Sequence, residues 1–185
     1  MKRSFPFVMK SIAVSTALLT ILLAFLYHRF SSSWLLSAAI TFGTVCYHFA
    51  MRLFVGAVIP NSFQYSSAWF QPRPWEHRLY QRLKVKAWKK YVPTYDPRLF
   101  ALEENTLEQI VSNVCQAEVV HEVIVLCSFV PLLFSLVFDG FFVFLITSIL
   151  SAVLDLVFVC LQRYNRPRLV RILQKRSAVP SCSKS

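Results

Sequence analysis

Four long apolar stretches alternate with polar, mostly basic segments along the 185-residue chain. A helix needs about 20 apolar residues to cross the roughly 30 Å hydrocarbon core of a bilayer. The stretches long enough to do so lie at about 11–27, 34–59, 114–137 and 141–161. The pattern therefore predicts an all-α integral membrane protein, in which residues 1–185 form a single domain with four transmembrane helices.

The first stretch admits a second interpretation, because a basic segment before an apolar stretch is also typical of a secretory signal peptide. No small-residue cleavage pattern follows this stretch, and the second span begins almost at once. We therefore expect residues 1–27 to be retained as a helix.

Residues 60–113 form the longest polar segment. From Trp75 to Tyr91, basic side chains alternate with aromatic or aliphatic ones at helical spacing. The apolar positions that recur every four residues are Trp75, Leu79, Leu83 and Ala87. Such a stripe predicts an amphipathic helix lying in the membrane interface.

Three local signals predict where helices begin, bend or turn. Asn105-Thr106-Leu107-Glu108 resembles a capping box and predicts a helix start. Pro131 predicts a bend in the third span, because proline cannot donate a backbone hydrogen bond. Asp139-Gly140 predicts a tight turn between the third and fourth spans.

The charge distribution predicts the topology. The chain is 56% hydrophobic and carries a net charge of +11. Eighteen of its twenty Lys and Arg residues lie in the N-terminal segment, in residues 60–113 or in the basic tail 162–185. Because basic loops stay on the cytoplasmic side, we expect a multi-pass cell-membrane protein with both termini and the 60–113 segment in the cytoplasm. Basic residues placed between apolar spans also argue against a nucleic-acid partner.

Ionisable residues cluster near the start of the third span. Glu118, His121 and Glu122 are three or four residues apart and therefore share one helix face. Charged groups inside a membrane helix are costly and usually face a cavity or a partner. His121 could accept a proton from a substrate hydroxyl, with Glu118 or Glu122 orienting its ring. A metal site is less favoured, because arginines disfavour a bound cation, so we predict no metal and no bound cofactor.

A second polar cluster, Gln162 to Arg168, follows the fourth span with the sequence QRYNRPR. A basic helix end that meets lipid headgroups is its simplest interpretation. However, a tight turn joins the third and fourth spans, so this cluster returns to the depth of Glu118 and His121. Its Arg and Asn side chains could hold an oxyanion or the phosphates of an acyl donor. Asp155, about 10 Å deeper along the helix, could reach the same cavity.

The candidate substrate- or oxyanion-binding residues are Gln162, Arg163, Tyr164, Asn165, Arg166, Arg168, Glu122, Asp155 and Trp88. In the second span, His48 and Arg52 share a face; Arg52 is expected to snorkel toward the membrane surface and His48 to be a packed, hydrogen-bonded group. The two clusters suit acyl transfer, but a network of Glu–Arg and His–Glu pairs that pins two helices together fits the same spacing.

Three blocks carry a resemblance to a known family. They are Lys86-Ala-Trp88-Lys89-Lys90-Tyr-Val-Pro93, Ala117-Glu118-x-x-His121 and Gln162-Arg163-Tyr164-Asn165-Arg166-Pro167-Arg168-Leu169. In these blocks the chain resembles the glycosyl-4,4'-diaponeurosporenoate acyltransferase family of bacterial carotenoid-glycoside biosynthesis. The resemblance implies an integral-membrane acyltransferase that esterifies a sugar hydroxyl of a glycosylated carotenoid with a fatty acyl group.

The sequence thus predicts a membrane acyltransferase with His121 as base and Glu118 as its orienting group. The donor would be an acyl-CoA or acyl-carrier thioester, and the acceptor a glycosylated, lipid-like molecule at the cytoplasmic membrane face. Two alternatives remain: a non-catalytic membrane scaffold or assembly protein, and another small lipid-modifying enzyme such as a methyltransferase.

Overall fold

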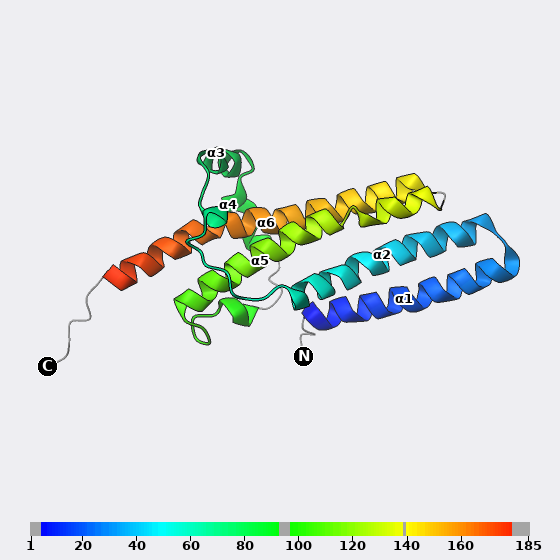
Figure 1. Cartoon of the computed structure of the whole chain (residues 1–185), viewed down its shortest axis with the longest axis horizontal. Helices are drawn as coiled ribbons and strands as arrows, with labels where there is room; N and C mark the ends of the chain where they lie inside the picture. Colours follow the sequence, from blue (N-terminus) through cyan, green and yellow to red (C-terminus); the bar gives the residue numbers. More distant parts are fainter. Residues whose placement is uncertain (1–4, 93–96, 139, 179–185) are drawn as a thin grey trace. The chain divides into compact units, whose positions relative to one another are not determined.

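The computed structural model describes residues 5–92, 97–138 and 140–178. Its α-helices are α1 (Phe5–Phe30), α2 (Ser33–Val58), α3 (Pro74–Arg82), α4 (Val85–Trp88), α5 (Leu107–Cys127) and α6 (Phe141–Ala178) (Figure 1). Shorter 3₁₀ helices lie at Ala68–Phe70, Lys89–Tyr91, Pro97–Phe100 and Val130–Leu136. No strand occurs within the described ranges.

Four helical stretches are long and apolar enough to cross a membrane. They are Pro6–Phe30, Ser33–Val58, Leu107–Leu136 and Phe141–Arg176. Each contains most of one predicted span, so the prediction of an all-α membrane protein with four such helices is confirmed. Pro93 and Asp139, two residues of the predicted motifs and turns, lie outside the described residues.

The chain forms two compact units. Unit 1 consists of Met1–Ile59 and Val120–Leu156, and unit 2 of Pro60–Val119 and Val157–Ser185. The divisions at 119/120 and 156/157 fall inside α5 and α6, because each of these helices contributes residues to both units. The expectation of a single domain stays a prediction.

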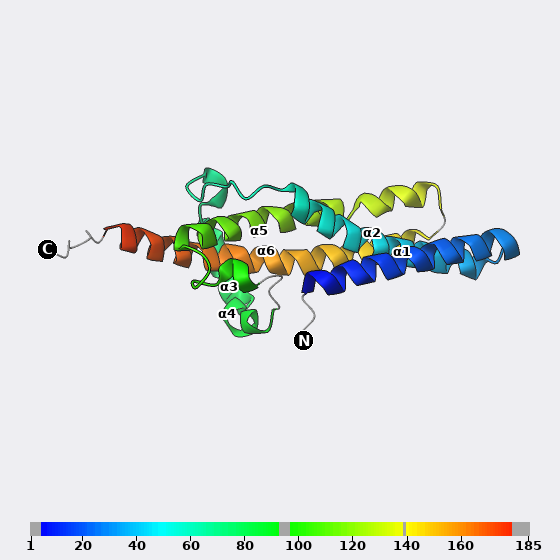
Figure 2. The ribbon, with the colours of Figure 1, turned by 90° about the horizontal axis from the view of Figure 1, so that it is seen from below.

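Unit 1 is built on a pair of neighbouring helices. In both ribbon views α1 and α2 run antiparallel and side by side (Figures 1 and 2). A Cβ atom at Gly43 would lie 3.3 Å from Thr20 Cγ2, so this glycine permits a close approach of α2 to α1. On α2, Met51 and Val55 pack against Ile124 of α5 and form the core of the unit.

The third predicted span, for which a bend at Pro131 was expected, is interrupted just before this residue. Helix α5 ends at Cys127, and the chain continues as the 3₁₀ helix Val130–Leu136 with Pro131 in its first turn. Proline is tolerated there because the first N–H groups of a helix have no partner within it. Gly140, with a φ of +119°, then leads into α6, a backbone conformation that favours glycine.

In unit 2, a reciprocal capping box starts α5. The backbone N–H of Gln109 donates to Thr106 Oγ1 at 3.2 Å, and the backbone N–H of Thr106 donates to Gln109 Oε1 at 2.8 Å. The predicted helix start is confirmed, although the box uses Thr106 and Gln109 in place of Asn105 and Glu108. The sequence places a polar residue at both alternatives, and only the backbone geometry selects between them.

Replacing Thr106 with alanine should lower the free energy of unfolding by about 1 kcal/mol, because it removes the acceptor for one helix N-terminal N–H group. Thermal unfolding of the purified protein in detergent micelles measures this loss. Thr106→Ser, which keeps the capping oxygen, is the matched control and should stay close to the wild type. An equal loss for the Ser and Ala variants would contradict the capping role.

A helix in the 60–113 segment is confirmed, but the single helix predicted over 75–91 is not. Helix α3 ends at Arg82, and Lys84 adopts a left-handed conformation with φ 51° before α4 begins at Val85. Val85 is fully buried, whereas Trp75 of the predicted apolar stripe is half exposed. The buried residue of α3 is Glu76, so an ion pair and one valine determine the buried side of this segment.

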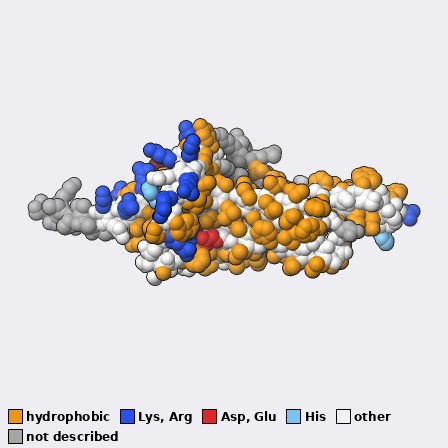
Figure 3. Space-filling model, turned by 90° about the horizontal axis from the view of Figure 1, so that it is seen from above, with side chains coloured by type: hydrophobic (Ala, Val, Ile, Leu, Met, Phe, Trp, Pro, Cys, Tyr) orange, Lys and Arg blue, Asp and Glu red, His pale blue; other side chains and the backbone are white. Residues whose placement is uncertain are grey.

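The fourth span also differs from the prediction, which ended it at residue 161. Helix α6 continues through the QRYNRPR cluster to Ala178, with Pro167 inside it. The extension packs in unit 2, where Leu173 joins a core with Leu107 and Val111. Lys and Arg side chains gather on the visible face of unit 2, whereas hydrophobic side chains predominate on that of unit 1 (Figure 3).

Candidate functional site

A connected polar cluster lies among α2, α5 and α6 of unit 1. At its centre Asp155 is only 1% exposed. Its Oδ1 lies 2.8 Å from His121 Nδ1, and its Oδ2 forms an ion pair with Arg52. Arg52 also donates to Ser151 Oγ at 2.8 Å, and this hydroxyl lies 2.9 Å from Ser128 Oγ. Side chains of α2 and α5 thus hold the Asp155 carboxylate of α6 from two sides.

The contact with Asp155 determines the chemistry that His121 can perform. A carboxylate accepts hydrogen bonds, so Nδ1 of the imidazole is the donor and Nε2 carries the lone pair. The His121 side chain is 22% exposed, whereas that of Asp155 is buried. A histidine oriented in this way by a buried carboxylate is the arrangement of a general base.

The carboxylate found on His121 is not the one that the sequence suggested. Glu118 or Glu122 was expected to orient the ring, but Asp155 occupies Nδ1. Arg52, expected to snorkel toward the membrane surface, pairs with Asp155 instead. A sequence signal for this pair exists: Arg52 is the one Lys or Arg in the second predicted span, and Asp155 the one acidic residue in the fourth. Opposite charges in two apolar helices stabilise each other by pairing.

His48 lies one turn before Arg52 on α2 and is 5% exposed. Its ring packs edge-on against Tyr47, with 5.5 Å between the ring centroids. Neither ring nitrogen has a hydrogen-bond partner among the described residues, so the expected hydrogen-bonded histidine is a packed but unsatisfied one.

A second buried cluster, in unit 2, joins two carboxylates to two guanidinium groups. Glu118 is fully buried and pairs with Arg166, which is 1% exposed. Arg163 lies between two carboxylates: its Nε is 3.0 Å from Glu118 Oε1, and its Nη1 is 2.7 Å from Glu76 Oε1. Arg166 also donates to the carbonyl of Phe70 at 2.5 Å. This ion-pair cluster ties the 60–113 segment to the unit 2 parts of α5 and α6.

The ion-pair cluster joins Glu118 to Arg163 and Arg166 of QRYNRPR, as the sequence led us to expect. Carboxylates engage both guanidinium groups. For these arginines, the arrangement corresponds to the structural alternative to acyl transfer, in which Glu–Arg pairs hold two helices together. Sequence reasoning missed Glu76, although it is the one carboxylate between residues 60 and 95. The Tyr80 hydroxyl donates to Glu76 at 3.3 Å, and burial together with this carboxylate raises the pKa of the Tyr80 phenol.

The remaining residues of QRYNRPR have other partners or face solvent. Asn165 Oδ1 accepts a hydrogen bond from Lys89 Nζ at 3.0 Å, and the same ammonium group lies 4.8 Å from the centroid of the Tyr164 ring. Arg168 is exposed, while Gln162 is half-buried.

Two further candidates lie elsewhere. Trp88 Nε1 donates to the Leu83 carbonyl at 2.9 Å, and Glu122 is a half-buried residue of α5 in unit 1.

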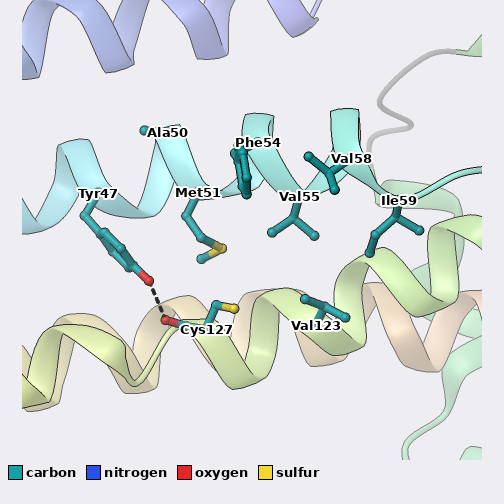
Figure 4. Close-up of a pocket in the computed structure, with 9 residues that line it drawn as sticks. All are labelled: Tyr47, Ala50, Met51, Phe54, Val55, Val58, Ile59, Val123 and Cys127. Carbon is teal, nitrogen blue, oxygen red and sulfur yellow. Dashed lines mark hydrogen bonds between the residues drawn. The ribbon is translucent and has the colours of Figure 1, made fainter.

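An open apolar groove of about 510 Å³ lies between α2 and α5 in unit 1 (Figure 4). The residues that line it are Tyr47, Ala50, Met51, Phe54, Val55, Val58, Ile59, Val123 and Cys127. The Tyr47 hydroxyl donates to the Cys127 carbonyl at 2.9 Å and closes one end of the groove. Among the described residues, no three His, Cys, Asp or Glu side chains form a group that could hold a metal ion.

The family model for glycosyl-4,4'-diaponeurosporenoate acyltransferases matches residues 66–175, which is more than half of the chain. The chain belongs to this acyltransferase family. Membership supports an acyltransferase role in the modification of carotenoid glycosides. No curated protein and no solved structure matches the chain. The range matched to the acyltransferase family contains His121 and Asp155 as well as the buried ion-pair cluster of Glu76, Glu118, Arg163 and Arg166, whereas Arg52 precedes it.

Proposed function

We propose that this family member is a membrane O-acyltransferase in which His121 is the general base. One observation carries the proposal: a buried Asp155 carboxylate lies 2.8 Å from His121 Nδ1 and is itself paired with Arg52. If this pair of residues, the His121–Asp155 dyad, served only to join two helices, its imidazole would not need to be partly exposed. With Nδ1 engaged by Asp155, Nε2 of His121 is the nitrogen that would accept a substrate proton.

The proposed reaction transfers a fatty acyl group from a thioester to a hydroxyl group. Nε2 of His121 accepts the hydroxyl proton while the oxygen attacks the carbonyl carbon of the thioester. The new C–O bond forms and the C–S bond breaks, and the proton passes from His121 to the leaving thiolate. The products are an ester and a free thiol. Asp155 stabilises the imidazolium that exists between the two proton transfers.

The donor and acceptor follow from the surroundings of the dyad. The apolar groove of unit 1 suits a fatty acyl chain, and it is lined mainly by residues of α2 and α5, the helices that also carry Arg52 and His121. We propose an acyl-CoA or acyl-carrier thioester as donor and a sugar hydroxyl of a glycosylated, carotenoid-like lipid as acceptor. The Lys and Arg residues of the N-terminal segment, of residues 60–113 and of the basic tail favour a cytoplasmic position for both termini and for the donor.

Lipid analysis of a strain that lacks the gene tests this function. The expected result is loss of an acylated glycolipid and accumulation of its unacylated form, with recovery on expression of the wild-type chain. Purified protein should then form the ester from a labelled acyl-CoA and the accumulated lipid. Transfer of a labelled methyl group from S-adenosylmethionine, with no ester formed, would indicate a methyltransferase. An unchanged lipid profile together with a missing membrane complex would indicate a scaffold.

A further inference from the structure

The side chains of the QRYNRPR cluster lie on two different sides of helix α6. Arg163 and Arg166 are three residues apart and both engage the buried carboxylates of unit 2. Tyr164, Asn165 and Arg168 lie on another side of the helix, because residues three and four apart share a face. There Asn165 and Tyr164 meet the aromatic-basic block of residues 86–90 through Lys89.

Lys89 is held in place from two sides. Its ammonium group donates to Asn165 Oδ1 at 3.0 Å and lies 4.8 Å from the centroid of the Tyr164 ring. These contacts orient a side chain that would otherwise be mobile in solvent. The Asn165 amide oxygen is used by Lys89, and its NH₂ group keeps the capacity to donate.

Among the described residues, the charges that act on Lys89 are those of Arg168 and Lys86, which are both positive. Burial, followed by the nearby charges of Arg168 and Lys86, lowers the pKa of Lys89. No carboxylate of the described residues forms an ion pair with Lys86, Lys89 or Arg168. Three cations and an amide donor, with the central cation partly desolvated, would be stabilised by an anion. Among the described residues, the carboxylate nearest to Lys89 in sequence is that of Glu76, which is already paired with Arg163.

We propose that Lys86, Lys89, Asn165 and Arg168 form a phosphate-binding site. The phosphate would belong to the coenzyme A part of the acyl donor or to a phospholipid headgroup. Two lysines, an arginine and an amide are the donors that phosphate oxygens favour. The coenzyme A source rests on the proposed acyltransferase function, whereas the phosphate chemistry of the site does not. This site replaces Arg163 and Arg166 as phosphate ligands, because those side chains are already neutralised.

The test is a titration of the purified full-length protein in maltoside micelles, which contain no phosphate. One arm uses coenzyme A, and the other uses a short-chain phosphatidylglycerol. Lys89→Gln, Arg168→Gln and the uncharged change Asn165→Ala should each weaken binding about tenfold. The matched control is Lys90→Gln, which removes the same charge one residue away, where the ammonium lies over the Tyr91 ring. The control should alter binding less than twofold.

Each outcome decides between the sources or ends the proposal. Weakened coenzyme A binding in the three variants assigns the site to the acyl donor, and weakened phosphatidylglycerol binding alone assigns it to a headgroup. Equal binding by Arg168→Gln and Lys90→Gln in both arms would overturn the site; Arg168 is exposed, so this variant should stay folded. Because binding needs no turnover, failure here is separate from failure of acyl transfer, which depends on His121.

Discussion

Replacing His121 with alanine should lower the rate of acyl transfer by about 10²- to 10⁴-fold, the usual contribution of a general base. The variant should still fold, because Asp155 keeps its ion pair with Arg52 when the imidazole is removed. The rate is measured as ester formed from a labelled acyl-CoA by protein purified in micelles. Thermal unfolding of the same sample shows whether the fold is retained.

Two further variants make this result specific. His77→Ala changes the same residue type on α3, where the exposed ring lies 2.9 Å from Gln81, and it should leave the rate within about twofold. Asp155→Asn should also lower the rate, because an amide stabilises an imidazolium less well than a carboxylate does. A folded His121→Ala protein that transfers the acyl group at the wild-type rate would rule out His121 as the base.

Glu118→Ala should destabilise the protein by about 3–5 kcal/mol, the usual cost of breaking a buried ion pair by removing one partner. The change leaves Arg166, which is 1% exposed, without its carboxylate, and Arg163 with only Glu76. Denaturant unfolding in micelles measures the loss. Glu108→Ala, an exposed position on the same helix, is the matched control and should cost much less.

The double variant Glu118→Leu with Arg166→Met separates the ion pair from packing. It removes both charges of the pair and leaves Arg163 balanced by Glu76, so it should recover most of the lost stability. The stability losses of the single variants Glu118→Leu and Arg166→Met are measured in the same way. If these two losses simply add in the double variant, the charges are not coupled and the cluster does not act as described.

The four apolar stretches determined the class of fold, because helices of this length that are apolar on all sides are typical of membrane spans. Local motifs indicated the start of α5 and an interruption of the third span near Pro131, where backbone chemistry decides the outcome. Neither the apolar pattern nor these motifs predicted the end of α3 or the length of α6. These helices carry Glu76, Arg163 and Arg166, whose ion pairs join segments distant in the sequence.

The residues with candidate chemistry were visible in the sequence, since charged groups inside apolar helices are rare enough to be noticed. The choice of partners was not visible. Helical spacing puts Glu118 and His121 on one face and therefore suggested that they act together, but spacing along one helix says nothing of the helix opposite. Only the tertiary structure shows that Asp155 contacts His121. It also shows that Glu118 pairs with Arg163 and Arg166. A buried charge is stabilised by the opposite charge that packing brings within reach, and packing joins residues that the sequence keeps far apart.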